Sequence, residues 1–256
     1  MKLTTSKPRH QIDVSKVEMN CDDNLTTDMN EVLVNKNHIA LFVGKSKSGK
    51  TNLAINLLTR NKRAGVRNSY KKVYDDIIVI SPSMHSSKDN PFDDLDDEKK
   101  FDTLDQDTLD FIVDFTETNA AECRNTLIFF DDVGSQLKTY NTQLALLTQK
   151  HRHLRTTFWF VAQKYNNIPT SIRANASVLY MFRPISNKEL ESVHAELLPF
   201  GRKDLTQFIE FVFDKKYNFL YIDLSLEKSA QPIYYKRFEK IIFDTPNDEH
   251  TTPTGY

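Results

Sequence analysis

Short hydrophobic runs alternate with amphipathic segments over most of this chain. The hydrophobic runs predict strands at 39–43, 74–81, 125–132, 156–163, 176–182, 219–225 and 233–238. The amphipathic segments, in which apolar residues recur every three or four positions, predict helices at 50–60, 108–121, 142–154, 186–198 and 203–214. Apolar strands that alternate with helices are typical of a mostly parallel sheet covered on both faces, so the predicted fold class is α/β.

Polar, weakly periodic sequence flanks this alternating region. We expect residues 1–35 to be an N-terminal arm or irregular lead-in, and residues 244–256 to be a disordered tail. The remaining residues, 36–243, then form one domain. Within it, residues 89–107 hold nine acidic and two basic side chains, a composition that predicts a solvated insertion.

Composition limits the possible partners and compartments. The formal net charge is −1, so a nucleic acid must meet a local basic patch and not an overall positive field. The N-terminus lacks the apolar core of a secretory signal, and no run approaches the roughly 18 apolar residues of a membrane span. Two distant cysteines offer neither a disulfide framework nor a zinc motif. We therefore expect a soluble intracellular protein without a membrane span.

Two of the six glycines lie five residues apart in "GKSKSGKT", Gly44 to Thr51. This string matches GxxxxGK[ST] and lies between a predicted strand and a predicted helix, the context of a phosphate-binding loop. There the backbone N–H groups turn toward one anion at the positive end of the helix. The predicted nucleotide-binding residues are Gly44, Lys45, Ser46, Lys47, Ser48, Gly49, Lys50, Thr51 and Asn52.

Within this loop, Lys50 is expected to reach the β- and γ-phosphates of ATP, and Thr51 to offer its hydroxyl to Mg²⁺. The strand predicted at 125–132 ends on two carboxylates, where the chain turns and both side chains can face the nucleotide. We expect Asp131 to hold Mg²⁺ and Asp132 to orient or deprotonate the attacking water. Gln163, at the end of the next strand, is expected to contact the γ-phosphate or that water. The cofactors are thus ATP and Mg²⁺.

Other nucleotide-dependent classes fit the sequence less well. The guanine-reading NKxD motif should follow the phosphate loop, but "NKNH" precedes it and "NKEL" has Leu190 in place of the aspartate. The LSGGQ string of ABC transporter subunits is absent from the sequence. The remaining motifs favour an ATPase of another class.

Together, "GKSKSGKT", "LIFFDD" and the block "HRHLRTTFWFVAQKYNNIPTSIRANASVLYMFRP" (151–184) resemble the genome-packaging ATPases of the FtsK–HerA superfamily. The closest branch is the poxvirus-type packaging ATPase of large double-stranded DNA viruses and virophages. The residues that carry this resemblance in the block are Arg152, His153, Gln163, Tyr165, Ile168, Pro169, Ile172, Arg173 and Asn175. Many superfamily members have glutamate where this chain has the shorter Asp132.

The resemblance implies a P-loop NTPase with a RecA-like core and an additional strand between the phosphate-loop strand and the Asp-Asp strand. It also implies a homo-oligomeric ring, hexameric or pentameric, that moves double-stranded DNA into a preformed capsid, with capsid proteins as partners. The expected location is the host cytoplasm or viral factory, with the virion as a third site. Arg152 would act on the γ-phosphate of a neighbouring subunit, and Arg155 and Arg173 are rival candidates.

A packaging motor must move any sequence, so DNA contacts are expected at phosphates. Candidates are the loop expected after the acidic pair at 134–143, with Lys138 and Tyr140, and also Lys164; the basic stretch 60–72 is another. Two other functions are considered. One is a HerA-like cellular or plasmid DNA translocase, and the other is a nucleotide-gated assembly scaffold without productive turnover.

Overall fold

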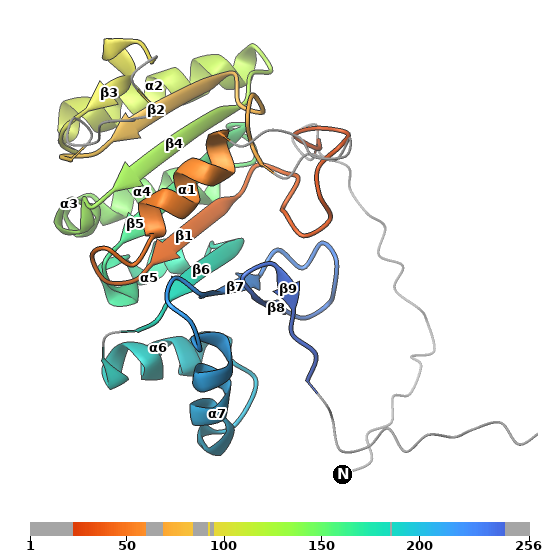
Figure 1. Ribbon diagram of the computed structural model, residues 1–256. Helices are drawn as coiled ribbons and strands as arrows, with labels where there is room; N and C mark the ends of the chain where they lie inside the picture. The colour runs from red at the N-terminus through yellow and green to blue at the C-terminus, as the bar shows by residue number, and fades with distance from the viewer. Residues whose placement is uncertain (1–22, 60–68, 84–91, 93–94, 185, 244–256) are drawn as a thin grey trace, which may run out of the picture.

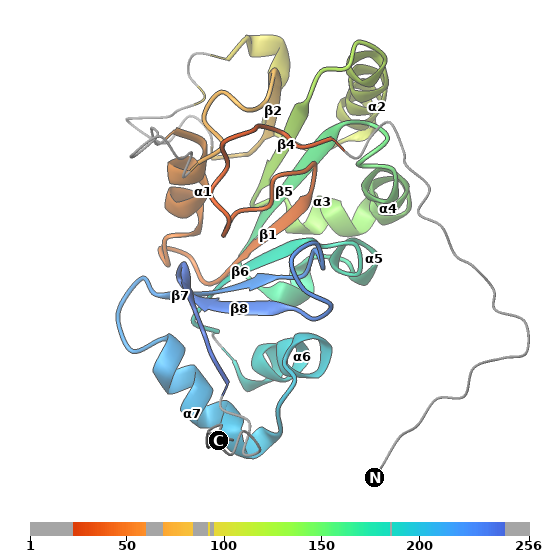
Figure 2. The ribbon, with the colours of Figure 1, turned by 90° about the vertical axis from the view of Figure 1, so that its right-hand side faces the viewer.

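One sheet runs through the whole described part of the chain, which comprises residues 23–59, 69–83, 92, 95–184 and 186–243 of this computed structural model. Its strands are β1 (Ile39–Val43), β2 (Asp76–Ile80), β3 (Lys100–Phe101), β4 (Thr126–Asp131), β5 (Thr156–Ala162), β6 (Val178–Phe182), β7 (Phe219–Asp223), β8 (Ile233–Lys236) and β9 (Glu239–Lys240). Helices lie on both faces (Figures 1 and 2). They are α1 (Lys50–Thr59), α2 (Gln106–Ala121), α3 (Gly134–Thr139), α4 (Asn141–Gln149), α5 (Thr170–Arg173), α6 (Asn187–Leu197) and α7 (Arg202–Val212), with 3₁₀ turns η2 (Asp97–Lys99) and η3 (Tyr165–Asn167).

The strand order is β3-β2-β4-β5-β1-β6-β7-β8-β9. Strands β3 to β6 in this order are parallel, and β7, β8 and β9 continue the sheet with antiparallel pairs. β5 lies between β1 and β4, so the additional strand predicted between the phosphate-loop strand and the Asp-Asp strand is confirmed. The predicted α/β fold with a mostly parallel sheet is confirmed as well.

Alternate residues of each central strand face different hydrophobic cores. In β1, Ile39, Leu41 and Val43 belong to a core shared with α2, α4, α6 and α7. Ala40 and Phe42 belong to a second core, formed with α1 and with irregular segments that precede β1 and β2. Figure 2 shows α1 on one side of the sheet, with α2, α4, α5 and α6 on the other. Both faces are thus covered, which explains the near-continuous apolar strands.

Several boundaries differ from the prediction. Segment 134–143 is not a loop, because α3 and the start of α4 occupy it. α4 ends at Gln149, before the turn that carries Arg152. α2 begins two residues earlier than expected, since Asp105 caps it by accepting a hydrogen bond from the Thr108 N–H (2.9 Å).

The described part of the acidic segment 89–107 is mostly exposed, as expected of a solvated insertion, but it is not without regular structure. It contains η2 and β3, and β3 pairs in parallel with β2 at the edge of the sheet. Phe92 and Leu104 are buried, with exposed fractions of 5% and 1%. The acidic side chains face water while a few apolar residues attach the segment to the sheet.

Residues 23–35 are irregular but pack onto the domain. Leu33 and Val34 are buried. The Tyr221 hydroxyl donates to the Val32 carbonyl (2.8 Å), and the Tyr70 hydroxyl donates to the Val34 carbonyl (2.9 Å). The domain boundary at residue 36 stays a prediction; residues 1–22 and the tail 244–256 lie outside the described residues.

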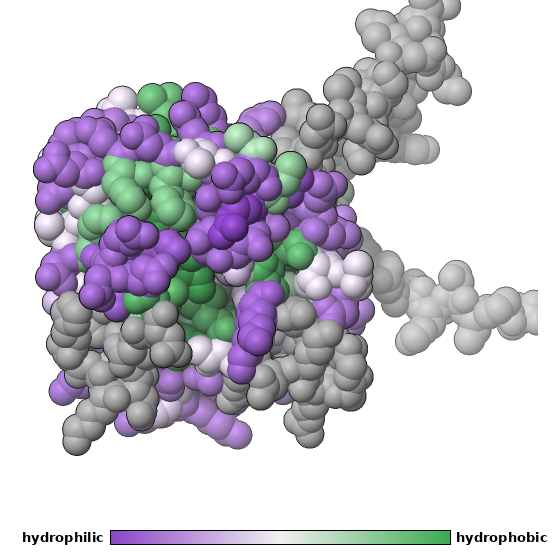
Figure 3. All heavy atoms as spheres, turned by 90° about the horizontal axis from the view of Figure 1, so that it is seen from above, coloured by the Kyte–Doolittle hydropathy of each residue, from purple (hydrophilic) through white to green (hydrophobic). Residues whose placement is uncertain are grey.

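The two edge strands of the sheet, β3 and β9, are each two residues long. Such short edges limit pairing with another molecule's strands. Seen from above, over the β3 edge, the surface is largely hydrophilic, with hydrophobic side chains showing between polar ones (Figure 3). None of the described helices combines the length and apolar character needed to cross a membrane.

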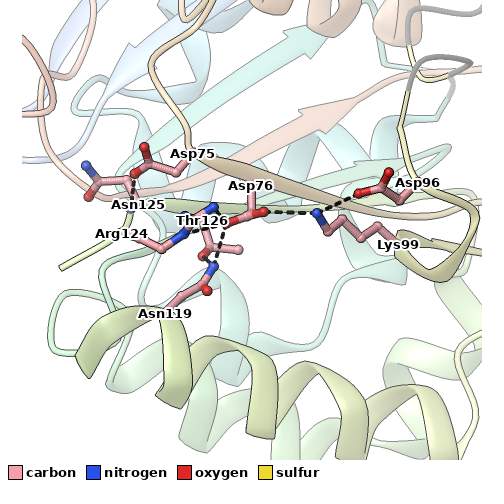
Figure 4. A network of polar contacts seen from close by, with 8 residues as sticks. All are labelled: Asp75, Asp76, Asp96, Lys99, Asn119, Arg124, Asn125 and Thr126. Atoms are coloured by element: carbon pink, nitrogen blue, oxygen red, sulfur yellow. Dashed lines mark hydrogen bonds and ion pairs between the residues drawn. The ribbon is translucent and has the colours of Figure 1, made fainter. Parts of the chain in front are cut away.

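The acidic segment is tied to the sheet by a buried carboxylate, Asp76 at the start of β2 (Figure 4). One oxygen of Asp76 accepts from Lys99 Nζ (3.1 Å), and the other accepts from Arg124 Nη2 (2.6 Å) and Asn119 Nδ2 (2.9 Å). Lys99 also pairs with Asp96 (3.0 Å). Burial opposes ionisation of Asp76, but these hydrogen bonds outweigh it and hold its pKa below the usual range.

We expect Asp76→Asn to lower the free energy of unfolding by about 2–3 kcal/mol, because Lys99 and Arg124 lose their shared anion. A carboxylate with a lowered pKa stabilises the fold above its unfolded pKa, and this stabilisation is lost as pH falls through the folded value. The difference between wild type and variant should therefore be full at neutral pH and shrink in acid. Urea unfolding at several pH values measures it, with Asp114→Asn, at an exposed carboxylate of α2 outside this network, as control.

Candidate nucleotide-binding site

The loop between β1 and α1 has the backbone geometry that the two glycines were expected to permit. Gly44 and Gly49 have φ angles of 153° and 105°, which residues with a side chain rarely adopt. A Cβ on Gly44 would also lie 2.6 Å from Phe182 Cβ, so the close approach of β6 excludes any larger residue. The Gly44 N–H donates to the Ala162 carbonyl (3.2 Å), which joins the loop to the end of β5.

Lys50, the first residue of α1, is buried under this loop. Its Nζ donates to the Lys45 carbonyl (3.1 Å). Burial lowers the pKa of Lys50, and the nearby carboxylates of Asp131 and Asp132 counteract part of that effect. The cation therefore lies beside the two predicted carboxylates.

A hollow of about 370 Å³ opens over the loop and the start of α1. It is lined by Lys47, Gly49, Lys50, Thr51, Asn52 and Tyr217. Most of the predicted nucleotide-binding residues thus meet at one hollow, whereas Lys45 and Ser46 are exposed beside it. Tyr217 was not predicted, because it lies more than 150 residues away in the sequence and reaches the loop only through the packing of β6 and β7.

Asp131, the last residue of β4, is buried beside this hollow. Burial is the main cause that raises its pKa to about 6, and repulsion from Asp132 adds to it. The Lys50 cation and hydrogen bonds with Thr51 and Ser81 act in the opposite direction. Ser81, directly after β2, was missed by the sequence reasoning because a lone serine at a strand end carries no distinctive pattern.

The contact between Thr51 and Asp131 fits a magnesium ion. A hydroxyl and a carboxylate are the oxygen ligands that Mg²⁺ prefers, and the ion keeps its other positions for water and substrate phosphates. Within the described ranges, no group of three or more His, Cys, Asp or Glu side chains could hold a metal. A metal at this site would therefore depend on the nucleotide for part of its coordination.

Asp132, the residue after Asp131, contacts the residue that follows β5. Both of its carboxylate oxygens accept from Gln163 Nε2, each at 3.1 Å. Asp132 has a left-handed φ of 57°, and its N–H donates to the Val161 carbonyl (3.1 Å). Aspartate tolerates this conformation better than most residues. The backbone turn thus lets two consecutive carboxylates lie at the carboxyl ends of the central strands, one buried and one exposed.

The three arginines lie in different surroundings. Arg152 is exposed in the turn before β5. β5, with seven residues, is about 20 Å long, and Arg152 precedes its amino end while Gln163 follows its carboxyl end. Arg155 has a left-handed φ of 46° and pairs with Asp23 (2.9 Å).

Arg173 is held within its own chain. Its Nη2 contacts Glu196 Oε1 (2.8 Å), its Nη1 donates to the Ile168 carbonyl (2.8 Å), and its guanidinium lies 4.5 Å from the ring centroid of Tyr165. The side chain is 9% exposed. These contacts connect the segment after Gln163 to α6 and leave Arg173 poorly placed to reach another subunit.

Two of the candidate DNA-contacting residues, Lys138 and Lys164, follow the carboxyl ends of β4 and β5 in the sequence. Lys138 is exposed on α3, which begins two residues after Asp132, and Lys164 is exposed directly after Gln163. Tyr140 is half-buried between α3 and α4. Of the basic stretch 60–72, residues 60–68 lie outside the described residues.

The raised pKa of Asp131 leads to an expected pH dependence. Mg²⁺ binds the ionised carboxylate, so the affinity for Mg-ATP should fall as pH drops below about 6. The folding stability of the nucleotide-free protein depends on pH in the opposite direction. Because the pKa of Asp131 is higher in the folded protein than in the unfolded chain, its contribution to stability, on the order of 2–3 kcal/mol, is present at low pH and is lost as pH rises toward 6. Asp131→Asn should flatten both profiles in binding titrations and thermal melts, whereas the exposed Asp114→Asn should leave them unchanged.

Comparisons with known proteins identify a family and several structures of similar fold. The family model described as Poxvirus A32 protein matches residues 27–249. The genome packaging NTPase B204 from Sulfolobus turreted icosahedral virus 2, in complex with AMPPCP, is 15% identical with a TM-score of 0.54, covering 78% of this chain and 97% of that chain. Its complex with ATP-gammaS is 16% identical with a TM-score of 0.53, covering 79% and 98%.

The DNA-packaging ATPase B204 from Sulfolobus Turreted Icosahedral Virus is 14% identical with a TM-score of 0.52, covering 78% of this chain and 97% of that chain. At these identities the structures share a fold with this chain. Comparison with curated proteins gave no match. The family match extends over most of the sequence and agrees with the resemblance to the poxvirus-type branch: the chain belongs to the Poxvirus A32 protein family.

Proposed function

We propose that this protein is an ATP-hydrolysing motor that moves double-stranded DNA into a preformed viral capsid. The observation that carries the proposal is the convergence of the phosphate loop, the two aspartates and Gln163 at the carboxyl ends of the neighbouring strands β1, β5 and β4. Family membership supports a packaging role, as do the similar folds of structures that are themselves named as genome-packaging and DNA-packaging enzymes.

In this proposal each residue has a distinct task. Lys50 exchanges the Lys45 carbonyl for the β- and γ-phosphate oxygens, and the loop N–H groups hold the same phosphates. Thr51 and Asp131 would hold Mg²⁺, which when bound neutralises developing charge on the phosphates. Asp132 orients or deprotonates the attacking water, and Gln163, now bonded to Asp132, senses the γ-phosphate beside it.

Steady-state ATP hydrolysis by the wild-type protein, measured with and without double-stranded DNA, tests the proposal. Stimulation by duplex DNA, without dependence on its sequence, is the expected result for a motor that contacts phosphates. Absence of hydrolysis under every assembly condition would instead favour the nucleotide-gated scaffold. A HerA-like cellular or plasmid translocase would also be stimulated by DNA, but it would not require a capsid shell for DNA uptake.

We also propose that the protein works as a homo-oligomeric ring, pentameric or hexameric, in which Arg152 reaches the nucleotide of a neighbouring subunit. Arg152 and Gln163 flank opposite ends of β5, a strand about 20 Å long, which supports action across an interface over action within one subunit. In this proposal the partners are capsid proteins. The location is the host cytoplasm, the viral factory or the virion.

Mixing two inactive variants tests the arginine. Arg152→Ala and Asp132→Ala subunits should each be inactive alone, and their mixture should recover part of the activity, because some mixed interfaces contain both intact groups. ATP hydrolysis is measured across mixing ratios, with co-assembly checked by analytical ultracentrifugation. The absence of recovery despite co-assembly would exclude Arg152, and repeating the test with Arg155→Ala would then examine its rival.

A further inference from the structure

A second cavity, of about 250 Å³, adjoins the hollow over the phosphate loop. Gly49, Asn52 and Tyr217 line both, so the two spaces are neighbours across these residues. The walls of the second cavity come from α1 (Leu53, Asn56 and Leu57), from the ends of β6 and β7, and from the turn between β8 and β9. It therefore lies on the opposite side of the phosphate loop from β4 and its carboxylates.

Aromatic rings dominate one wall of this cavity. Phe182 and Phe219 are buried at its base, while Tyr217 and Phe238 are unusually exposed for aromatic residues, at 55% and 39%. The Tyr217 ring lies close to the phosphate loop, since a Cβ on Gly49 would be 3.5 Å from Tyr217 Cδ1. Lys216 Nζ lies 4.7 Å from the ring centroid of Tyr217. Two aromatic surfaces are thus available to a ligand beside the phosphate hollow.

The backbone at this cavity is strained at two places. Tyr217 has a φ of 66° and Arg237 a φ of 58°, and both residues line the cavity. A bulky residue in the left-handed region is an outlier that persists only where the surroundings hold it. Here the Arg237 N–H donates to the Phe219 carbonyl (2.8 Å), and the Asn218 N–H, next to Tyr217, donates to the Lys215 carbonyl (3.2 Å).

The chemistry of the lining fits a flat, mostly apolar ring system. Apolar walls with a few polar groups, here Asn52, Asn56 and Arg237, are typical of small-molecule sites. A third cavity, which also touches Tyr217, differs because cationic side chains surround it: Lys45, Lys47, Arg183, Lys215 and Lys216. That environment suits an anion better than a neutral ring.

We propose that the cavity between α1 and the β8–β9 turn binds the purine base of the nucleotide, with Tyr217 as the stacking residue and Phe238 as a second wall. The assignment rests on the proposed function, because the triphosphate in the neighbouring hollow sets the distance at which a base can lie. Stacking on an aromatic ring depends little on hydrogen-bond pattern, and a purine covers more of the ring than a pyrimidine does.

Comparison of two ligands, ATP and inorganic tripolyphosphate, tests the base site separately from the phosphate site. The variant Tyr217→Asn removes the ring but tolerates the left-handed backbone. It should bind ATP on the order of tenfold more weakly while its affinity for tripolyphosphate is unchanged. Tyr217→Phe should restore ATP binding, and Phe211→Asn, at an aromatic residue of similar exposure (53%) away from this cavity, should have no effect.

Isothermal titration calorimetry of the protein gives all of these affinities. Wild-type preference for ATP over CTP, lost in Tyr217→Asn, would complete the expected result. Equal weakening of ATP and tripolyphosphate would mean that the ring shapes the phosphate loop, and unchanged ATP binding would mean that the base lies elsewhere; either overturns the proposal. If the wild-type protein bound neither ligand, the proposed function itself would fail.

Discussion

Replacing Asp132 by asparagine is expected to lower kcat for ATP hydrolysis by about 10²- to 10⁴-fold, while ATP still binds. The carboxylate is the group proposed to orient or deprotonate water, and the amide can accept a hydrogen bond but cannot take a proton. Asparagine tolerates the left-handed φ of 57° as well as aspartate does, so the backbone turn should persist. Single-turnover hydrolysis and ATP titration together separate the loss of chemistry from any loss of binding.

Two companion variants sharpen this test. Asp132→Glu keeps a carboxylate one methylene longer, as in many superfamily members, and should retain much more activity than the asparagine variant. Asp114→Asn removes an exposed carboxylate from α2 and should behave as wild type. Wild-type turnover by Asp132→Asn would mean that Asp132 does not act on the water. Gln163 would then be the candidate for positioning the water.

Replacing Lys50 by alanine is expected to weaken ATP binding by about 10- to 100-fold and to bring hydrolysis below detection. The side chain is buried against the loop and supplies the cation proposed for the β- and γ-phosphates. Its removal also takes away the cation that opposes protonation of Asp131, so the pKa of that carboxyl should rise further above its usual range. Mg-ATP binding should therefore become more sensitive to acid.

Titration with ATP at two pH values measures both effects of Lys50→Ala. Lys188→Ala, at an exposed lysine of α6, is the control for the loss of one positive charge. If Lys50→Ala bound ATP with wild-type affinity, the phosphate loop would not be the nucleotide site. Weaker ATP binding by Lys50→Ala at both pH values would support direct contact between Lys50 and the phosphates. A larger difference from wild type at the lower pH would support the electrostatic link between Lys50 and Asp131.

Much of the site could be predicted from the sequence because its central part is local. The phosphate loop, Lys50 and Thr51 form one continuous stretch whose glycines, with φ of 153° and 105°, admit few other residues. Asp131 and Gln163 end strongly apolar runs, and parallel strands bring such ends to one edge of the sheet. The prediction missed regular structure where local composition misled. The acidic segment contributes β3, and the expected loop after Asp132 is α3.

The sequence by itself determined the fold class, the family and the phosphate loop. The signals for them are local, because the spacing of hydrophobic residues and the glycines that permit an unusual backbone conformation each involve only a few neighbouring residues. Only the tertiary structure decided which distant side chains complete the site. Ser81 meets Asp131 because β2 pairs with β4, Tyr217 reaches the phosphate loop because β7 pairs with β6, and Arg173 is held by Glu196 on α6. Strand pairing and burial set these contacts, and they depend on the whole sheet.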